Sequence, residues 1–213
     1  MQIDIFNTDK KYNIIYADPP WSFKTYSDAG KDRSPDNHYS VLNLEDIKKL
    51  PVKNIAAKDC MLFMWTIDTH IPQALEVIKS WGFTYKTVGF TWTKLNKTAK
   101  LDKVDVSKDI FTGMGYWTRA NPEICFMAET PEFDVDRCLL ATMGHPKRQS
   151  ASVRKAVLDY RREHSRKPDQ IYGRIEQLLG DIPRIELFAR QQQKGWDSWG
   201  NETTKFNESE PAI

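Results

Sequence analysis

The chain has 213 residues, of which 40% are hydrophobic and 28% are charged, and its formal net charge is +2. This composition is typical of a soluble globular protein and excludes a disordered chain. The length suits one α/β domain and leaves little room for a second core. The apolar stretches are too short to cross a bilayer and residues 1–4 lack a signal-peptide pattern, so we expect a cytoplasmic protein.

The three cysteines, Cys60, Cys125 and Cys138, are odd in number and far apart in the sequence. They form no Cys-x-x-Cys pair and no cluster with histidine, which are the patterns that structural zinc sites use. We therefore expect neither a disulfide framework nor a bound metal, and a reducing compartment.

The first predicted strand, residues 13–17, is a short apolar run rich in β-branched residues, as buried strands are. It ends at Asp18, because Pro19 and Pro20 cannot donate ladder hydrogen bonds. This position places Asp18 at the carboxyl end of a sheet strand, where open α/β sheets bind their ligands. Trp21 follows with a flat aromatic ring.

An acid, a fixed carbonyl and an aromatic ring can together hold a planar base by its exocyclic amine. Asp18 and the carbonyl of Pro19 supply two acceptors for the two N–H groups of such an amine, and Trp21 supplies a stacking surface. The alternative is a strand-ending turn in which Trp21 belongs to the core, since Asp and Pro are ordinary turn residues.

The middle of the chain alternates predicted loops, helices and strands. A long polar loop beside the first strand has the character of a lid, and an Asn-capped helix ended by Pro51 follows it. The next elements are a buried strand, a helix with apolar residues at helical spacing, and two strand-like pieces around Gly89. The loop covers residues 22–37, the capped helix 43–50, the buried strand 61–67, the second helix 70–81 and the two strand-like pieces 83–94.

The second half is expected to contain fewer regular elements. A charged loop (95–115) leads to a strand (122–128), a surface segment (129–150) and a basic stretch (151–163). A helix (168–179), a final strand (184–190) and a turn-rich segment (191–202) follow. We expect one domain over residues 1–202, followed by a polar tail over residues 203–213.

Positive charge is concentrated between Lys147 and Arg174, where nine Lys or Arg residues face three acids. An excess of six charges over 28 residues is suited to a phosphate backbone. The alternative is a solvated face whose arginines pair with acids elsewhere on the domain.

The tetrad Asp18-Pro19-Pro20-Trp21 resembles the catalytic motif of the MT-A70 family of adenine-N6 methyltransferases. Three later blocks match the family in order and spacing, at residues 165–169, 184–190 and 195–202. The resemblance implies a Rossmann-like fold that uses S-adenosylmethionine, with a mostly parallel sheet and helices on both faces. It also implies that the tetrad is catalytic.

The cofactor site can be predicted from this resemblance alone, because the chain has neither a G-x-G-x-x-G nor a P-loop motif. In the family, the Lys before Pro-Asp binds the methionine carboxylate, residues after the Glu-Leu-Phe strand contact the ribose, and the last block contacts the ribose and adenine. The residues so implied are Asp4, Ile5, Asp18, Lys167, Arg190, Gln192, Asn201 and Glu202.

The substrate side follows from a second segment, Gly113-x-Gly-x-Trp-x-Arg-x-Asn-x-Glu123, which resembles prokaryotic and phage members of the family. Residues expected to face nucleic acid are Tyr26, Arg119, Asn121, Glu123, Arg161, Arg162 and His164. DNA is the favoured substrate; RNA, or a non-catalytic scaffold role, are the alternatives. A homodimer or an accessory subunit is compatible with the sequence, which does not specify the recognition site.

Overall fold

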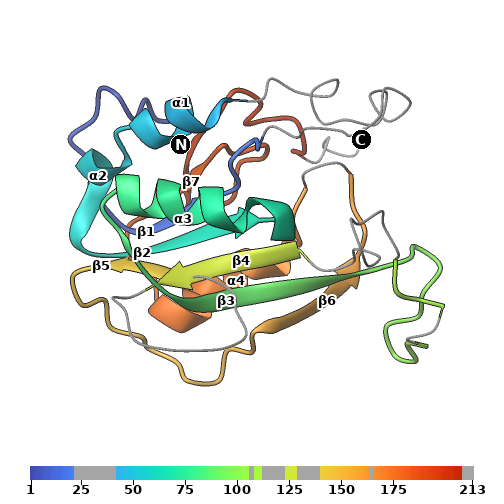
Figure 1. The fold of residues 1–213 in the computed structure, drawn as a ribbon. Helices are drawn as coiled ribbons and strands as arrows, with labels where there is room; N and C mark the ends of the chain where they lie inside the picture. Colours follow the sequence, from blue (N-terminus) through green and yellow to red (C-terminus); the bar gives the residue numbers. More distant parts are fainter. Residues whose placement is uncertain (22–41, 106–107, 112–122, 129–139, 164–165, 208–213) are drawn as a thin grey trace, which may run out of the picture.

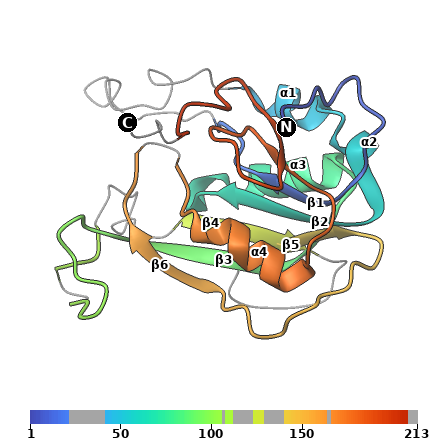
Figure 2. The same ribbon diagram turned by 180° about the vertical axis from the view of Figure 1, so that it is seen from behind.

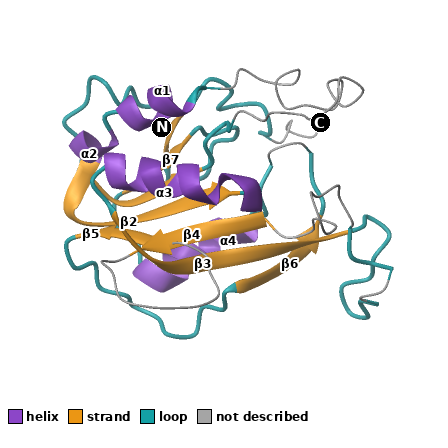
Figure 3. Ribbon diagram, in the orientation of Figure 1, coloured by secondary structure: helices purple, strands orange, loops and turns teal. Residues whose placement is uncertain are grey.

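The computed structural model describes residues 1–21, 42–105, 108–111, 123–128, 140–163 and 166–207. One sheet of eight strands runs through them, in the order β6-β3-β4-β5-β2-β1-β7-β8 (Figures 1 and 3). The strands are β1 (Tyr12–Ala17), β2 (Ala56–Thr66), β3 (Thr84–Leu95), β4 (Glu123–Ala128), β5 (Leu140–Met143), β6 (Ala156–Tyr160), β7 (Arg184–Leu187) and β8 (Asp197–Trp199). The helices are α1 (Leu44–Lys49), α2 (Val52–Ile55), a 3₁₀ turn η3 (Asp68–His70), α3 (Ile71–Ser80) and α4 (Gln170–Leu179).

Helices cover both faces of the sheet, with α1 to α3 on one face and α4 on the other (Figures 1 and 2). Strand β1 contributes Ile15 and Ala17 to the core on the α3 face, and Ile14 and Tyr16 to the core on the α4 face. This alternation follows from the two-residue period of a strand. Because both faces are buried, the strand reads as a continuous apolar run, as the sequence predicts.

The sheet is parallel where it carries β1 and mixed elsewhere. Strand β1 pairs in parallel with β2 and β7, and β7 pairs in parallel with β8. Strands β4 and β5 run antiparallel to β2 and β3, whereas β6 is parallel to β3. The expected α/β fold with helices on both faces is confirmed, and its parallel character is strongest around β1.

The helix ends agree with their sequence signals. The side chain of Asn43 accepts a hydrogen bond from the backbone N–H of Asp46 at 2.9 Å and so caps α1. Gly82 follows α3 with φ of 81°, the left-handed conformation expected just after a helix. Both helices are ten residues or shorter, and no helix in the described part of the chain is long and apolar enough to cross a membrane.

Four strands depart from the sequence prediction. Strand β5 lies within residues 129–150, which were expected to be a surface segment, and its four residues are too few for a periodic pattern. Residues 83–94 form one strand rather than two, with a register shift between Val88 and Phe90 at Gly89. The basic stretch contains β6, and the turn-rich segment contains β8.

Residues 203–207, expected to belong to a polar tail, pack against the domain. Thr203 is 5% exposed, and the backbone N–H of Phe206 donates to the carbonyl of Arg190 at 2.9 Å. The guanidinium of Arg166 lies 5.6 Å from the Phe206 ring centroid. At the other end of the chain, Gln2 forms a bridge with Ser198, which extends the edge of the sheet at β8.

Two glycines should respond oppositely to alanine. Gly173 lies in α4 with no atom within 4 Å of an added Cβ, so Gly173→Ala should stabilise the fold by about 0.5–1 kcal/mol. Gly144 has φ of 67°, and an added Cβ would meet the Lys58 carbonyl oxygen, so Gly144→Ala should destabilise it. Urea titration of both variants measures the difference, and equal midpoints would contradict the backbone geometry described for Gly144.

Candidate active site

Asp18 lies directly beyond β1, at the carboxyl edge of the parallel part of the sheet. Ala17, the last residue of β1, pairs with Met64 of β2 on one side and Leu187 of β7 on the other. Both neighbouring strands are parallel to β1, so the segments that follow them converge on Asp18. The expected position of this acid is therefore confirmed.

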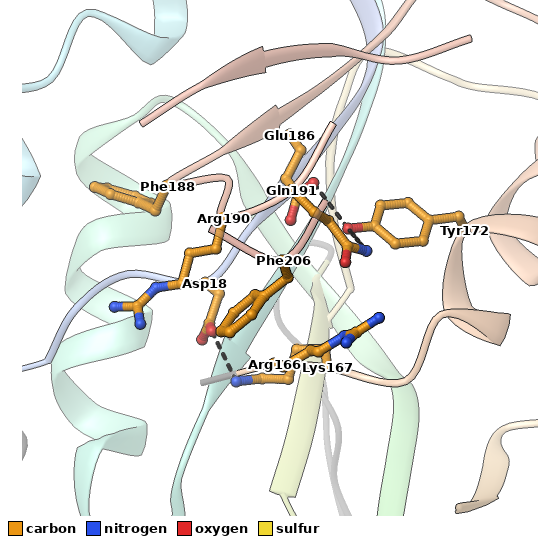
Figure 4. Close-up of a pocket in the computed structure, with 9 residues that line it drawn as sticks. All are labelled: Asp18, Arg166, Lys167, Tyr172, Glu186, Phe188, Arg190, Gln191 and Phe206. Atoms are coloured by element: carbon orange, nitrogen blue, oxygen red, sulfur yellow. Dashed lines mark hydrogen bonds and ion pairs between the residues drawn. The ribbon is translucent and has the colours of Figure 1, made fainter. Parts of the chain in front are cut away.

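Asp18 forms an ion pair with Lys167, 149 residues away in the sequence (Figure 4). Its Oδ2 atom lies 2.7 Å from the Lys167 Nζ atom, and the two side chains are 21% and 12% exposed. The ammonium also lies 5.5 Å from the ring centroid of Trp65, within the range of a cation–π contact. The first and the Lys-Pro-Asp blocks of the sequence thus meet at one point.

The carbonyl of Pro19 accepts a hydrogen bond from the backbone N–H of Trp21 at 2.9 Å. This contact closes a three-residue turn and fixes the direction of the carbonyl. A carbonyl oxygen has two lone pairs, so the turn leaves accepting capacity at Pro19.

Trp21 lies in the core rather than presenting an open face. Its side chain is 6% exposed, packs in the core of the α3 face, and donates from Nε1 to the Trp65 carbonyl at 3.2 Å. Its ring centroid lies 6.0 Å from that of His70. The turn interpretation of the tetrad describes this ring correctly, and Trp21 anchors the loop that carries Asp18.

Two adjoining pockets open beside Asp18. The inner pocket is lined by Asp18, Arg166, Lys167, Tyr172, Glu186, Phe188, Arg190, Gln191 and Phe206, and its volume of about 20 Å³ has room for a water molecule (Figure 4). The outer pocket, of about 240 Å³, approaches the range of small-ligand sites. Its lining comprises Asp18, Pro20, Leu42, Phe188, Ala189, Arg190, Trp199, Gly200, Asn201 and Glu202. Asp18, Phe188 and Arg190 border both.

The wall shared by the pockets has an unusual backbone. Phe188 adopts φ of 61°, a left-handed conformation that is rare outside glycine, and its ring packs edge-on against Trp199. Beside it, a Cβ added to Gly200 would lie 2.6 Å from the Ala189 carbonyl oxygen. The segments after β7 and β8 therefore touch backbone to backbone and form the floor of the outer pocket.

A buried carboxyl lies behind the ion pair. Glu186 on β7 is 9% exposed, and the Tyr172 hydroxyl donates to its Oε2 atom at 2.8 Å. Burial raises the pKa of Glu186 to about 8; the hydrogen bond from Tyr172 opposes this shift, Asp18 adds to it and Lys167 opposes it. Burial, followed by the charge of Glu186, likewise raises the pKa of Tyr172 well above 10.

The arginines next to the site are largely engaged with acids. Arg162 and Arg166 both pair with Asp169, and Arg162 also lies 3.9 Å from Asp159. Arg161 is exposed, and its guanidinium lies 4.4 Å from the ring centroid of Phe111.

The basic stretch does not form one continuous face. Strand β5 runs antiparallel to β2, and Met143 at its end pairs with Cys60 near the start of β2. The exposed residues Lys147 and Arg148 therefore lie beyond the end of the sheet opposite to Asp18. Strand β6 runs in the same direction as β2, so Arg161, which follows it, lies at the end of the sheet that carries Asp18. Only part of the charge excess is near the pockets.

The structure gathers some of the implied cofactor residues and separates others. Asp18, Lys167, Arg190, Asn201 and Glu202 line the two pockets, and Arg190 lies 3.6 Å from Glu202. Neither pocket includes the remaining implied residues: Ile5 is buried in the core, Asp4 is exposed, and Gln192 is exposed with its backbone bound to Asn207.

Several implied substrate residues cannot be placed. Tyr26, Arg119, Asn121 and His164 lie outside the described residues, and Glu123 is described only as the first residue of β4. In the part of the chain that is described, no group of three or more His, Cys, Asp or Glu side chains gathers as a metal site would.

Six residues of the inner pocket were not predicted as site residues: Arg166, Tyr172, Glu186, Phe188, Gln191 and Phe206. An acid within an otherwise apolar strand was a usable signal for Glu186, since buried charges need a reason. Phe206 carried no such signal, because it lies in a polar segment expected to fray. The positive φ of Phe188 is a property of the backbone that no residue type indicates.

Comparison with known proteins agrees with this geometry. The MT-A70 family model matches residues 12–202. A type II methyltransferase, M.MunI from Mycoplasma sp, is 30% identical over 208 residues, which cover 91% of this chain and 78% of that protein.

More distant relatives are eukaryotic. An N(6)-adenosine-methyltransferase MT-A70-like protein of Arabidopsis thaliana and the human N(6)-adenosine-methyltransferase catalytic subunit METTL3 are each 26% identical to the chain. The matches cover 94% and 95% of this chain but only 24% and 30% of those proteins. The match of the family model to most of the sequence, and the meeting of its motifs at Asp18, lead to one conclusion: the chain belongs to the MT-A70 family of S-adenosylmethionine-dependent adenine-N6 methyltransferases.

Proposed function

We propose that this protein transfers a methyl group from S-adenosylmethionine to the N6 amine of adenine in DNA. The observation that carries the proposal is the 2.7 Å pair of Asp18 and Lys167 at the junction of two pockets. One partner is suited to a substrate amine and the other to the carboxylate of an amino acid, so both reactants can meet there.

The donor groups around the pockets fit the chemistry of the cofactor. Lys167 offers three N–H donors, so it can bind a carboxylate while keeping its contact with Asp18. Asn201 and Glu202 line the outer pocket and offer hydrogen bonds for ribose hydroxyls and an adenine ring. Arg190 borders both pockets and completes this wall. When bound, the cofactor supplies the electrophilic methyl group.

The protein's own contribution to the reaction is alignment and charge stabilisation. The lone pair of an adenine amine is delocalised into the ring, so the amine is a poor nucleophile. Asp18 and the carbonyl of Pro19 can accept its two N–H groups and hold it in line with the methyl group, and such alignment can supply up to ~7–11 kcal/mol. Asp18 also stabilises the positive charge that develops on N6. The proton of the methylated amine can then pass to water.

DNA is favoured over RNA because the bacterial relative is a type II methyltransferase that this chain covers to 78%. RNA remains the second candidate, since the plant and human relatives are named N(6)-adenosine methyltransferases. In duplex DNA the target adenine must leave the stack, which costs a few kcal/mol. Because Trp21 is buried, the stacking partner has to come from another residue.

Methyl transfer to matched DNA and RNA oligomers tests the proposal directly. With tritiated S-adenosylmethionine, nucleoside analysis should find the label in N6-methyladenine of DNA. Label confined to RNA would contradict the choice of substrate.

The control is Asp18→Ala, which removes one of the two acceptors for the amine. We expect its turnover to fall by about 10²–10³-fold, as when one group that stabilises transition-state charge is removed. Wild-type turnover in a folded Asp18→Ala protein would contradict the mechanism.

Cofactor binding should depend on Lys167 and Asn201. Loss of a charge-assisted hydrogen bond in Lys167→Ala should weaken affinity for S-adenosylmethionine by about 10- to 100-fold, and Asn201→Ala by about fivefold. Calorimetric titration measures both, with Lys147→Ala at the opposite sheet edge as a matched control. If the three variants bind equally well, the cofactor lies elsewhere.

Nucleic-acid affinity should fall with salt, with a log–log slope of about −0.9 per neutralised phosphate on duplex DNA. Arg161 is exposed at the edge that carries Asp18, so Arg161→Ala should flatten the slope by about one unit. Arg162→Ala should change it less, because Arg162 is already paired with acids.

Fluorescence anisotropy at several salt concentrations provides the slopes, and Arg148→Ala serves as the control at the opposite edge. A flatter slope for Arg148→Ala than for Arg161→Ala would mean that nucleic acid meets the other edge of the sheet.

A further inference from the structure

Glu186 is a carboxyl group placed in the wall of the inner pocket by the register of the sheet. It pairs with Tyr16 across β7 and β1, and Asp18 lies two residues beyond Tyr16. Residues two apart in extended chain point to the same side of a sheet, so Glu186 lies on the side toward which Asp18 projects. Both side chains line the inner pocket (Figure 4).

One oxygen of this carboxyl has a fixed role as an acceptor. Gln191 donates from Nε2 to the Tyr172 hydroxyl at 3.2 Å, and Tyr172 donates its single proton to Glu186 Oε2 at 2.8 Å. The pKa of Tyr172 is raised well above 10, so this donor stays protonated throughout the neutral range. A proton on Glu186 would therefore reside on its other oxygen.

The charges that face Glu186 come from three segments. Asp18 follows β1, Arg166 and Lys167 precede α4, and Arg190 follows β7. Asp169 is linked to Glu186 indirectly, because it accepts a hydrogen bond from Gln191, which also donates to the Tyr172 hydroxyl. With a pKa of about 8, Glu186 is neutral at neutral pH when only these groups surround it.

We propose that Glu186 distinguishes S-adenosylmethionine from its product: it ionises when the cationic cofactor binds, and it keeps its proton with the neutral S-adenosylhomocysteine. This inference rests on the proposed function, which places the cofactor beside Asp18 and Lys167. Glu186 is thereby a residue that sets specificity. Its carboxylate favours binding of the positively charged cofactor, and the loss of the sulfonium charge on methyl transfer favours release of the product.

The physical basis is a difference of one charge between two ligands of otherwise similar shape. A nearby cation stabilises a carboxylate and lowers its pKa. The two ligands present the same amino acid and adenosine groups, so their contacts with Lys167 and Arg190 cancel in a comparison. A difference in proton release between them therefore reports on the group that responds to the sulfonium charge.

A purely structural role would be to hold Tyr172 in place. Glu186→Gln separates the two roles, because its amide oxygen can still accept from the Tyr172 hydroxyl whereas its side chain cannot ionise. Tyr172→Phe is the converse variant: it removes the hydrogen bond and keeps the carboxyl.

Calorimetry at pH 6.5, in two buffers of different ionisation enthalpy, counts the protons released by each ligand. At this pH the α-amino groups of both ligands are protonated. Wild type should release up to about one more proton with S-adenosylmethionine than with S-adenosylhomocysteine. Its affinity for S-adenosylmethionine relative to the product should rise up to tenfold per pH unit, toward a limit near pH 8.

The two variants should give opposite results in this experiment. Glu186→Gln should lose both the excess proton and the pH dependence, and Tyr172→Phe should retain them. Equal proton counts for the two ligands in wild type, an unchanged difference in Glu186→Gln, or loss of the difference in Tyr172→Phe would each overturn the inference. If wild type binds neither ligand, the proposed cofactor site itself fails, which is a different outcome.

Discussion

The position of strand β1 is the constraint on which the site depends. It is hydrogen-bonded to a parallel strand on either side, and its residues from Ile14 to Ala17 are at most 1% exposed. A strand held on two edges and two faces cannot shift its register without exposing a core face. The position of Asp18 is therefore fixed. Strands β2 and β7 and the segment before α4 bring later parts of the chain next to it.

The arrangement of charge around Asp18 shows why the pockets hold several ionisable groups without a surplus of buried charge. Each acid near the site has a specific partner: Asp18 pairs with Lys167, and Asp169 pairs with Arg162 and Arg166. Glu186 has a hydroxyl donor instead of a cation, and neutralisation by a proton is the cheaper state for such a group. Among these acids, Glu186 is the one whose charge a ligand can change.

Much of the fold could be predicted from local pattern. The buried run ending in Asp18, the Asn-capped helix and the amphipathic helix α4 all carry strong signals, and each is confirmed. Strand β5 could not be predicted, because four residues do not establish a period and its pairing with β2 is a tertiary contact. The same reason explains why the sequence did not predict that the basic stretch is divided between the two ends of the sheet. Charge density can be counted along the sequence, whereas the separation of Arg148 from Arg161 depends on strand directions.

The candidate site divides in the same way. Asp18, Lys167 and Asn201, which lie in the matched motifs, line one or both of the pockets. Trp21 is buried despite belonging to the most specific motif, because its indole N–H finds a backbone acceptor within the core. Phe206 reaches the pocket through a hydrogen bond to Arg190 that no sequence pattern records.

The backbone contact between Gly200 and Ala189 limits how this site can diverge. No side chain fits at position 200 without moving the segment after β7, and that segment contains Phe188 in its left-handed conformation. Insertions or larger residues at this point would therefore be selected against, whatever ligand the pocket bound. Changes in ligand preference have to arise through side chains that project from this floor, such as those of Arg190 and Glu202, while the path of the chain beneath them stays constant.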